Sequence, residues 1–168
     1  MSKTINIGIA GLGTVGGGVI NNLSRNRENL RDKYGLDFNI LGISASNKTK
    51  KRSINIEDYG WFDNPLDLAK DRNIDLIIEL IGGEKDIAFD LAIETIKNKK
   101  GFITANKALI STNGKILSKL SGKNNVFFGY EAAVAGGIPI IKTLKSGLFL
   151  DKINDIFGIL NGTSNFIL

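Results

Sequence analysis

The chain opens on a short apolar segment that runs directly into a glycine-rich turn. Residues 4–10 (TINIGIA) have the composition of a buried strand, and residues 11–16 (GLGTVG) follow without a spacer. A segment with helical periodicity, residues 15–30, comes next. A GxGxxG pattern has a defined structural meaning only in this setting, between a strand and a helix.

Each glycine of the turn has a separate physical task. Gly11 permits a tight turn, Gly13 lets the backbone approach a pyrophosphate, and Gly16 allows the helix to pack closely on the strand. The amide groups at Thr14 and Val15 then face an anion at the positive end of the helix. We therefore predict a dinucleotide site here, with a ligand-free glycine turn as the alternative.

Two residue types are missing from the chain, and their absence excludes several chemistries. The 168 residues include no cysteine and no histidine. Disulfides, zinc thiolates, thiol nucleophiles, Ser-His-Asp hydrolysis and histidine metal sites are therefore excluded within the chain. Any acid or base must be Lys, Asp, Glu or Tyr.

Charge and hydropathy favour a cytoplasmic domain with small-molecule ligands. The net charge of +5 comes from lysines scattered along the chain, so we expect no nucleic-acid partner. The chain has no secretion signal and no apolar run long enough to span a membrane. We expect a cytoplasmic location and no membrane association.

Apolar strands alternate with amphipathic helices, which predicts an α/β fold, a Rossmann-type doubly wound parallel sheet. We assign residues 1–130 to this domain. Residues 131–168 are predicted to begin a second, α+β domain that the chain does not complete. The expected strands are 4–10, 38–45, 75–81, 101–104, 126–130 and 156–160, and the expected helices 15–30, 64–70, 86–98 and 114–120.

Ligands of such a sheet bind beyond the carboxyl ends of its strands. Four polar or glycine-rich segments are expected at this edge: residues 11–16, 44–47, 82–83 and 104–107. Lys107 directly follows a strand, which favours contact with cofactor or substrate over an ordinary surface or capping lysine.

The end of the second strand indicates the cofactor. NAD sites usually carry an acid there for the ribose hydroxyls, whereas this chain has Ser44–Asn47 followed by a basic run, residues 48–52. We predict NADP, with NAD possible; the alternative is a solvated basic loop. The predicted cofactor-binding residues are Gly11, Gly13, Thr14, Val15, Gly16, Ala45, Lys48, Gly82 and Lys107.

Four segments together carry a family resemblance: residues 11–16, 104–110 (TANKALI), 130–141 (YEAAVAGGIPII) and 158–168 (GILNGTSNFIL). In this order they resemble the homoserine dehydrogenase family, over the whole chain. The resemblance implies an oxidoreductase that interconverts L-homoserine and L-aspartate 4-semialdehyde, in threonine, methionine and isoleucine biosynthesis.

The resemblance also implies residue roles. Lys107 would be catalytic and substrate-binding, since an ammonium can donate to an oxygen that gains negative charge. Gly162 and Thr163 would lie beside substrate and nicotinamide. A monovalent cation, Na⁺, would be bound by Glu131 and three backbone carbonyls; an ordinary capping carboxylate is the alternative for Glu131. The carbonyls belong to Val134, Gly136 and Ile138.

The family's further catalytic Asp, second Lys and substrate-binding Glu lie beyond the last motif found here. The chain is therefore expected to be an N-terminal portion that binds cofactor without full catalysis, and the complete enzyme to be a homodimer. A non-catalytic NAD(P)-binding or redox-sensing module is the main alternative. The glucose-fructose-oxidoreductase-like family is disfavoured because residues 84–86 (EKD) lack its proline, and aspartate-semialdehyde dehydrogenase needs a cysteine.

Overall fold

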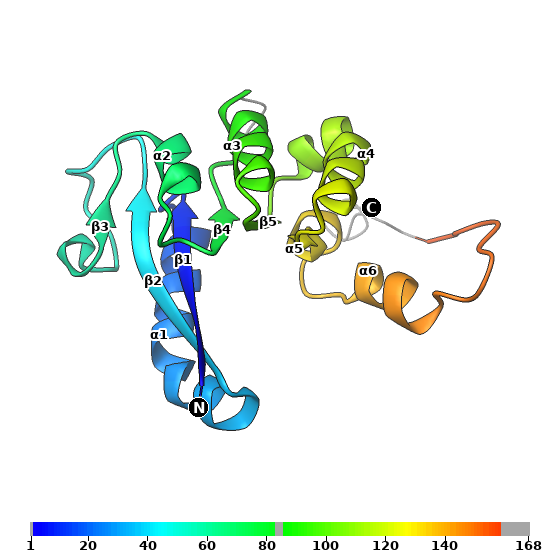
Figure 1. The fold of residues 1–168 in the computed structure, drawn as a ribbon, viewed down its shortest axis with the longest axis horizontal. Helices are drawn as coiled ribbons and strands as arrows, with labels where there is room; N and C mark the ends of the chain where they lie inside the picture. The colour runs from blue at the N-terminus through cyan, green and yellow to red at the C-terminus, as the bar shows by residue number, and fades with distance from the viewer. Residues whose placement is uncertain (1, 83–85, 159–168) are drawn as a thin grey trace, which may run out of the picture.

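The sheet has six parallel strands in the order β3-β2-β1-β4-β5-β6 (Figure 1). The computed structural model describes residues 2–82 and 86–158. The strands are β1 (Lys3–Ala10), β2 (Leu36–Ser44), β3 (Gly60–Trp61), β4 (Leu76–Glu79), β5 (Gly101–Thr104) and β6 (Phe128–Gly129). This order reverses between β1 and β4, as in a doubly wound dinucleotide-binding sheet. The predicted α/β class is confirmed.

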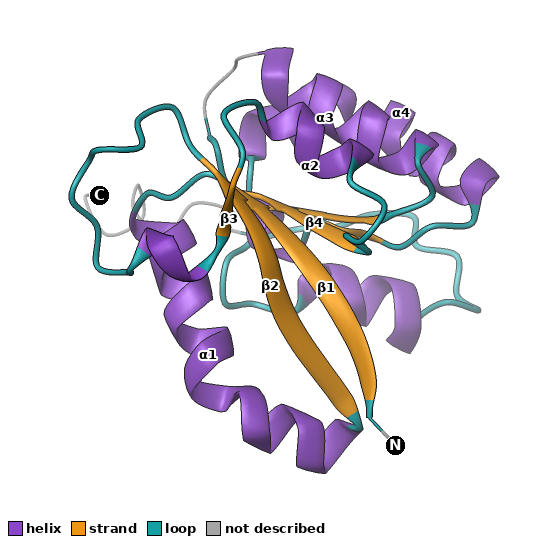
Figure 2. Cartoon of the chain, turned by 60° about the vertical axis from the view of Figure 1, so that its left-hand side comes forward, coloured by secondary structure: helices purple, strands orange, loops and turns teal. Residues whose placement is uncertain are grey.

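Helices cover both faces of the sheet (Figure 2). The first helix, α1, packs on one face, and α2, α3 and α4 lie side by side on the other. Of the short helical turns, η1 lies between β2 and β3, and α5, α6 and η2 follow β6. The bounds are α1 (Thr14–Tyr34), η1 (Ile56–Asp58), α2 (Pro65–Lys70), α3 (Asp86–Lys97), α4 (Lys107–Asn124), α5 (Glu131–Val134), α6 (Ile140–Lys142) and η2 (Thr143–Gly147).

Alternation along the strands divides the core into two layers. Ile7 and Ile9 of β1 point toward α1 and meet Ile20 there, each no more than 1% exposed. Ala10 points the other way, into the layer under α2, α3 and α4, where Phe102 is fully buried. Because burying a side chain of this size contributes roughly 1.5–3 kcal/mol, the two layers hold α1 and the α2–α4 group to the sheet.

Polar side chains fix several element ends. Asn64 caps α2 by accepting the Leu66 amide, and Asn106 caps α4 by accepting the Leu109 amide. Gly35 ends α1 in the left-handed region, with φ at 66°.

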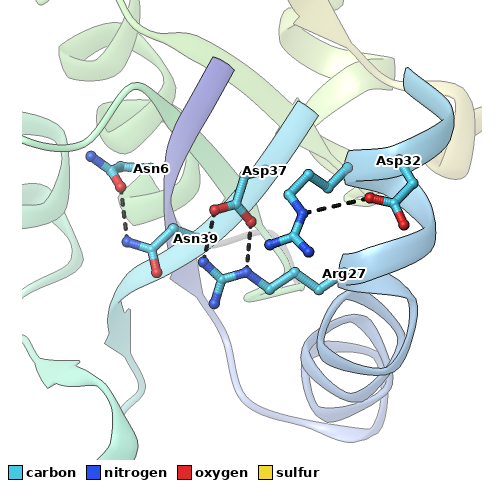
Figure 3. A network of polar contacts seen from close by, with 6 residues as sticks. Asn6, Arg27, Asp32, Asp37 and Asn39 are labelled. Carbon is cyan, nitrogen blue, oxygen red and sulfur yellow. Dashed lines mark hydrogen bonds and ion pairs between the residues drawn. The ribbon is translucent and has the colours of Figure 1, made fainter. Parts of the chain in front are cut away.

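An ion pair joins α1 to β2 on the surface (Figure 3). The Arg27 guanidinium donates to both Asp37 oxygens, at 2.6 and 2.9 Å. This hydrogen-bonded partner lowers the pKa of the Asp37 carboxyl below its ordinary value.

Three expectations about elements change. The helix expected at 114–120 begins at Lys107, because Asn106 supplies the cap. The strand β3 was not predicted, since two residues carry no periodic signal. The strand expected at 156–160 is absent at residues 156–158, which have no regular structure; residues 159–160 lie outside the described residues.

The segment after α5 leaves the sheet (right side of Figure 1). Its apolar side chains are largely exposed, Phe149 at 70% and Phe157 at 91% among them. In the described parts of the chain, no helix is both long enough and apolar enough to cross a membrane.

Candidate functional site

A groove opens at the carboxyl edge of the sheet beside the glycine turn. It holds about 380 Å³, a size typical of small-molecule sites. Two of the four segments expected at this edge contribute to it, through residues 11–13 and 44–47, and residues 80–81, just before the third segment, also line it. The groove is lined by Gly11, Leu12, Gly13, Ser44, Ala45, Ser46, Asn47, Lys50, Arg52, Asp63, Pro65, Leu80, Ile81 and Ile87.

The three glycines of the turn differ in whether the surrounding protein leaves room for a side chain. Gly11 has φ at +104°, and a Cβ there would lie 2.4 Å from the Leu80 carbonyl. A Cβ at Gly16 would lie 2.0 Å from the Gly11 oxygen. Around Gly13, by contrast, no described atom lies within 4 Å of such a Cβ. The chain's own packing thus explains Gly11 and Gly16, whereas Gly13 faces open space.

The start of α1 presents amide groups to this opening. Gly13 is the N-cap without a side-chain cap, and the Gly17 amide is bonded to the Gly13 carbonyl at 2.9 Å. The amides of Thr14 and Val15 come before that bond, at the end of the helix that favours an anion. The first turn carries no acidic residue.

The basic loop after β2 contributes two side chains to the groove: one ammonium that is free, and one guanidinium that is bonded to the loop itself. Lys50 lines the groove and is exposed. Arg52 also lines it, but its guanidinium donates to the carbonyls of Asn47, Lys48 and Lys50. It also lies 5.8 Å from the Trp61 ring. Arg52 therefore holds the loop closed rather than standing free for a ligand.

The groove lining differs from expectation at two residues, one absent from it and one present. Lys48, predicted to bind cofactor, is not among the lining residues; its Nζ lies 5.7 Å over the Trp61 ring. Asp63 lines the groove, although no acid was expected near it. Its Oδ1 accepts the Trp61 indole N–H at 2.7 Å. Asp63 follows β3, and that strand was not visible in the sequence.

The other predicted cofactor- and substrate-binding residues that the structure describes lie at the same edge of the sheet. Ala45 lines the groove, and Gly82 lies in the left-handed region, with φ at +69°, just after the lining residue Ile81. Lys107 is the first residue of α4, exposed and outside the groove lining. It still follows β5 at the same edge of the sheet, since Thr104 pairs with Glu79. Gly162 and Thr163 lie outside the described residues.

In the region predicted to bind a cation, the Glu131 carboxylate and the Ile138 carbonyl accept hydrogen bonds from backbone amides of the chain. The Glu131 carboxylate accepts the amides of Ile141 and Lys142, at 2.9 and 3.0 Å. The Ile138 carbonyl accepts the Ile140 amide at 2.8 Å. Val134 lies at the end of α5, and Gly136 is exposed just after it. Within residues 2–82 and 86–158, no three His, Cys, Asp or Glu side chains are grouped as a metal site. Glu131 acts here as a cap for α6.

Strand order, glycine turn and groove together define a dinucleotide-binding domain of the Rossmann class. Two family models match the chain. Residues 11–131 match the NAD-binding domain of homoserine dehydrogenase, and residues 139–168 match a second homoserine dehydrogenase model. The chain belongs to the homoserine dehydrogenase family.

Relatives extend this likeness along the whole chain. The homoserine dehydrogenase of Neisseria gonorrhoeae is 42% identical over 99% of this chain, and that of Pseudomonas aeruginosa is 40% identical over 99%. The chain spans 38% of each. A solved homoserine dehydrogenase from Thiobacillus denitrificans superposes with a TM-score of 0.85 at 39% identity, covering 99% of this chain and 38% of that one.

Proposed function

We propose that the groove binds NADP(H) and that the chain forms the nicotinamide-binding part of an enzyme interconverting L-homoserine and L-aspartate 4-semialdehyde. The observation that carries the proposal is the open space at Gly13 beside the first amides of α1. An α1 without an acid in its first turn and with room at its N-terminus suits a pyrophosphate. NADPH would supply the hydride to the aldehyde carbon, and the oxygen would gain a proton.

Lys50 favours the phosphorylated cofactor. It is a free ammonium in the groove at the end of β2, where a ribose 2′-phosphate would be recognised. Asp63 would favour NAD, because an acid at this place can bond the ribose hydroxyls. Its carboxylate, however, already accepts the Trp61 indole N–H. We therefore keep NADP as the proposed cofactor.

Lys107 is proposed as the proton donor on the substrate side. Its ammonium extends from the start of α4 at the ligand-bearing edge, where it could stabilise charge on the carbonyl oxygen. The family's downstream Asp, Lys and Glu are not among these residues, so we expect cofactor binding by this chain with negligible turnover. Homoserine oxidation at a typical enzymatic rate, on the order of 10 per second, would contradict that expectation.

The cofactor proposal is tested by titrating NADPH and NADH into the chain at fixed salt and following nicotinamide fluorescence. NADPH is expected to bind more tightly. Lys50→Met should weaken NADPH about tenfold, the usual effect of losing one charge-assisted hydrogen bond, and NADH far less. Lys123→Met, which removes an equal charge from the last turn of α4, is the control. Tighter binding of NADH, or equal effects of Lys50→Met and Lys123→Met, would overturn the assignment.

A monovalent cation at Glu131 is a separate proposal. The carboxylate keeps lone pairs beyond the two that accept amides, so a Na⁺ beside it is chemically possible. The expected result is a higher Tm in NaCl than in tetramethylammonium chloride at equal ionic strength, with the difference lost in Glu131→Gln. Equal Tm values in the two salts would leave Glu131 as a helix cap alone.

A further inference from the structure

A fully buried carboxylate lies at the end of β4. Glu79 is 0% exposed, next to Ile77 and Ile78 in a strand of otherwise apolar residues. Burying a carboxylate is costly unless hydrogen bonds replace its hydration. Both oxygens are bonded here: Oε1 accepts the Ile81 amide at 2.7 Å, and Oε2 accepts the Thr104 hydroxyl at 2.5 Å.

The hydroxyl continues the network into α4. Thr104 Oγ1 accepts the Asn106 amide at 2.9 Å, so its own proton is directed to Glu79. The Asn106 side chain in turn accepts the Leu109 amide at 3.0 Å. The buried carboxylate is therefore linked, through one hydroxyl, to the residue that caps α4 and immediately precedes Lys107.

The other oxygen is linked to the groove. Ile81 lines the groove and follows Leu80, whose carbonyl lies against Gly11. The Ile81 amide is held by Glu79, because it donates to Oε1 of that carboxylate. One side chain thus connects the wall of the cofactor groove with the start of the helix that carries Lys107.

We propose that Glu79 is a positioning residue that sets Lys107 in register with the cofactor groove. The proposal rests on the proposed function, because it assumes that cofactor and Lys107 act together. The two carboxylate oxygens of Glu79 have different roles. Oε1 orders the groove wall, and Oε2 orders the start of α4 through Thr104. Glu79 is not proposed to bind metal or cofactor, or to take part in the reaction itself.

Four variants separate the two links. Thr104→Val is nearly isosteric and removes the link to α4, together with the hydroxyl that donates to Glu79 Oε2, but leaves the bond to the Ile81 amide; Thr104→Ser retains the hydroxyl. Glu79→Leu removes both links. Glu79→Gln keeps an oxygen for the Ile81 amide and can donate to the second lone pair of Thr104 Oγ1, so it retains both.

The readouts are the NADPH dissociation constant and the exchange rate of the Asn106 amide, measured by NMR on the whole chain. Thr104→Val should speed Asn106 exchange about fivefold and leave NADPH affinity unchanged. Thr104→Ser should restore the wild-type rate. Glu79→Leu should raise both exchange and the NADPH constant, the latter about threefold or more, and Glu79→Gln should stay close to wild type.

A merely structural role would move stability and both readouts together, without this split. Unchanged Asn106 exchange in Thr104→Val, failure of Thr104→Ser to restore it, or unchanged NADPH affinity in a folded Glu79→Leu would overturn the proposal. If Glu79→Leu does not fold, the Thr104 pair still decides the α4 link. Failure of the wild-type chain to bind NADPH would instead count against the proposed function, since the exchange measurement needs no cofactor.

Discussion

At the scale of single residues, the glycine turn shows that one motif combines two kinds of requirement. Gly11 and Gly16 are enforced by atoms of the chain itself, at 2.4 and 2.0 Å from a hypothetical Cβ. Gly13 adopts φ −77° and ψ −162°, a conformation open to any residue. Contacts within the chain therefore do not require glycine at this position, in keeping with the proposed pyrophosphate site.

Gly13→Ala should therefore retain the fold and lose the cofactor. Its methyl group meets no protein atom, and the reduced entropy of the unfolded chain offsets the weaker preference for Ala at an N-cap, so Tm should change little. NADPH should bind at least about tenfold more weakly, because the methyl group occupies space at the pyrophosphate position. Thermal unfolding and cofactor titration check both statements.

Gly16→Ala is the matched comparison and should lower Tm, since its Cβ would collide with the Gly11 carbonyl. If Gly13→Ala binds NADPH as the wild type does, the phosphates do not lie at this turn.

At the scale of elements, periodic segments and the capped helix α2 could be predicted, whereas the start of α4 and strand β3 could not. The apolar run of β4 and the helical spacing of α3 were enough to locate both elements. The start of α4 was misplaced because Asn106 and Lys107 look like a loop until the Asn106 cap is recognised. Strand β3 has two residues and pairs with β2. It is too short for a periodic signal, so Asp63 could not be placed in the groove from sequence.

The same limit applies to the candidate site. The positions of Gly11, Gly13 and Ala45 at the groove could be predicted because local spacing identifies strand ends. The roles of Lys50, Arg52 and Lys48 depend on how the loop folds back on Trp61, which no spacing encodes. Glu79 was missed because a single acid in an apolar run gives no sign of its partners on β5.

The ion pair between α1 and β2 makes the stability of the fold depend on pH in a defined direction (Figure 3). Arg27 lowers the pKa of Asp37 in the folded state, so the unfolded chain binds more protons between the folded and the ordinary pKa. The stabilisation is therefore present above the ordinary Asp pKa and is lost as pH falls through the folded value. Arg27→Met should lower Tm modestly at neutral pH, with the difference from wild type disappearing in acid.

Arg31→Met is the comparison, because its guanidinium lies 3.7 Å from the largely exposed Asp32 and makes only the smallest of the contributions that lower the pKa of Asp37. A surface pair of that kind contributes little, so no comparable pH-dependent difference is expected. A difference for Arg27→Met that persists unchanged into acid would assign the effect to packing of the side chain.

At the scale of the whole molecule, burial divides the chain near α5. Buried apolar side chains occur from β1 through Ala133, whereas residues 148–158 are exposed. We predict that limited trypsin digestion cuts first after Lys152, and that the amino-terminal product binds NADPH within about twofold of the intact chain. Mass spectrometry and cofactor titration provide the test; a first cut inside residues 2–124, or loss of binding, would contradict this division.

The shortness of the outer strands bears on how the protein can aggregate. Both edges of the sheet, β3 and β6, are two residues long, so few unpaired backbone groups are available to a strand from another molecule. Growth of intermolecular β-structure along the sheet is thereby disfavoured. Self-association at high concentration would begin instead from the exposed apolar side chains after α6, and it would be a reversible, salt-promoted clustering rather than fibre formation.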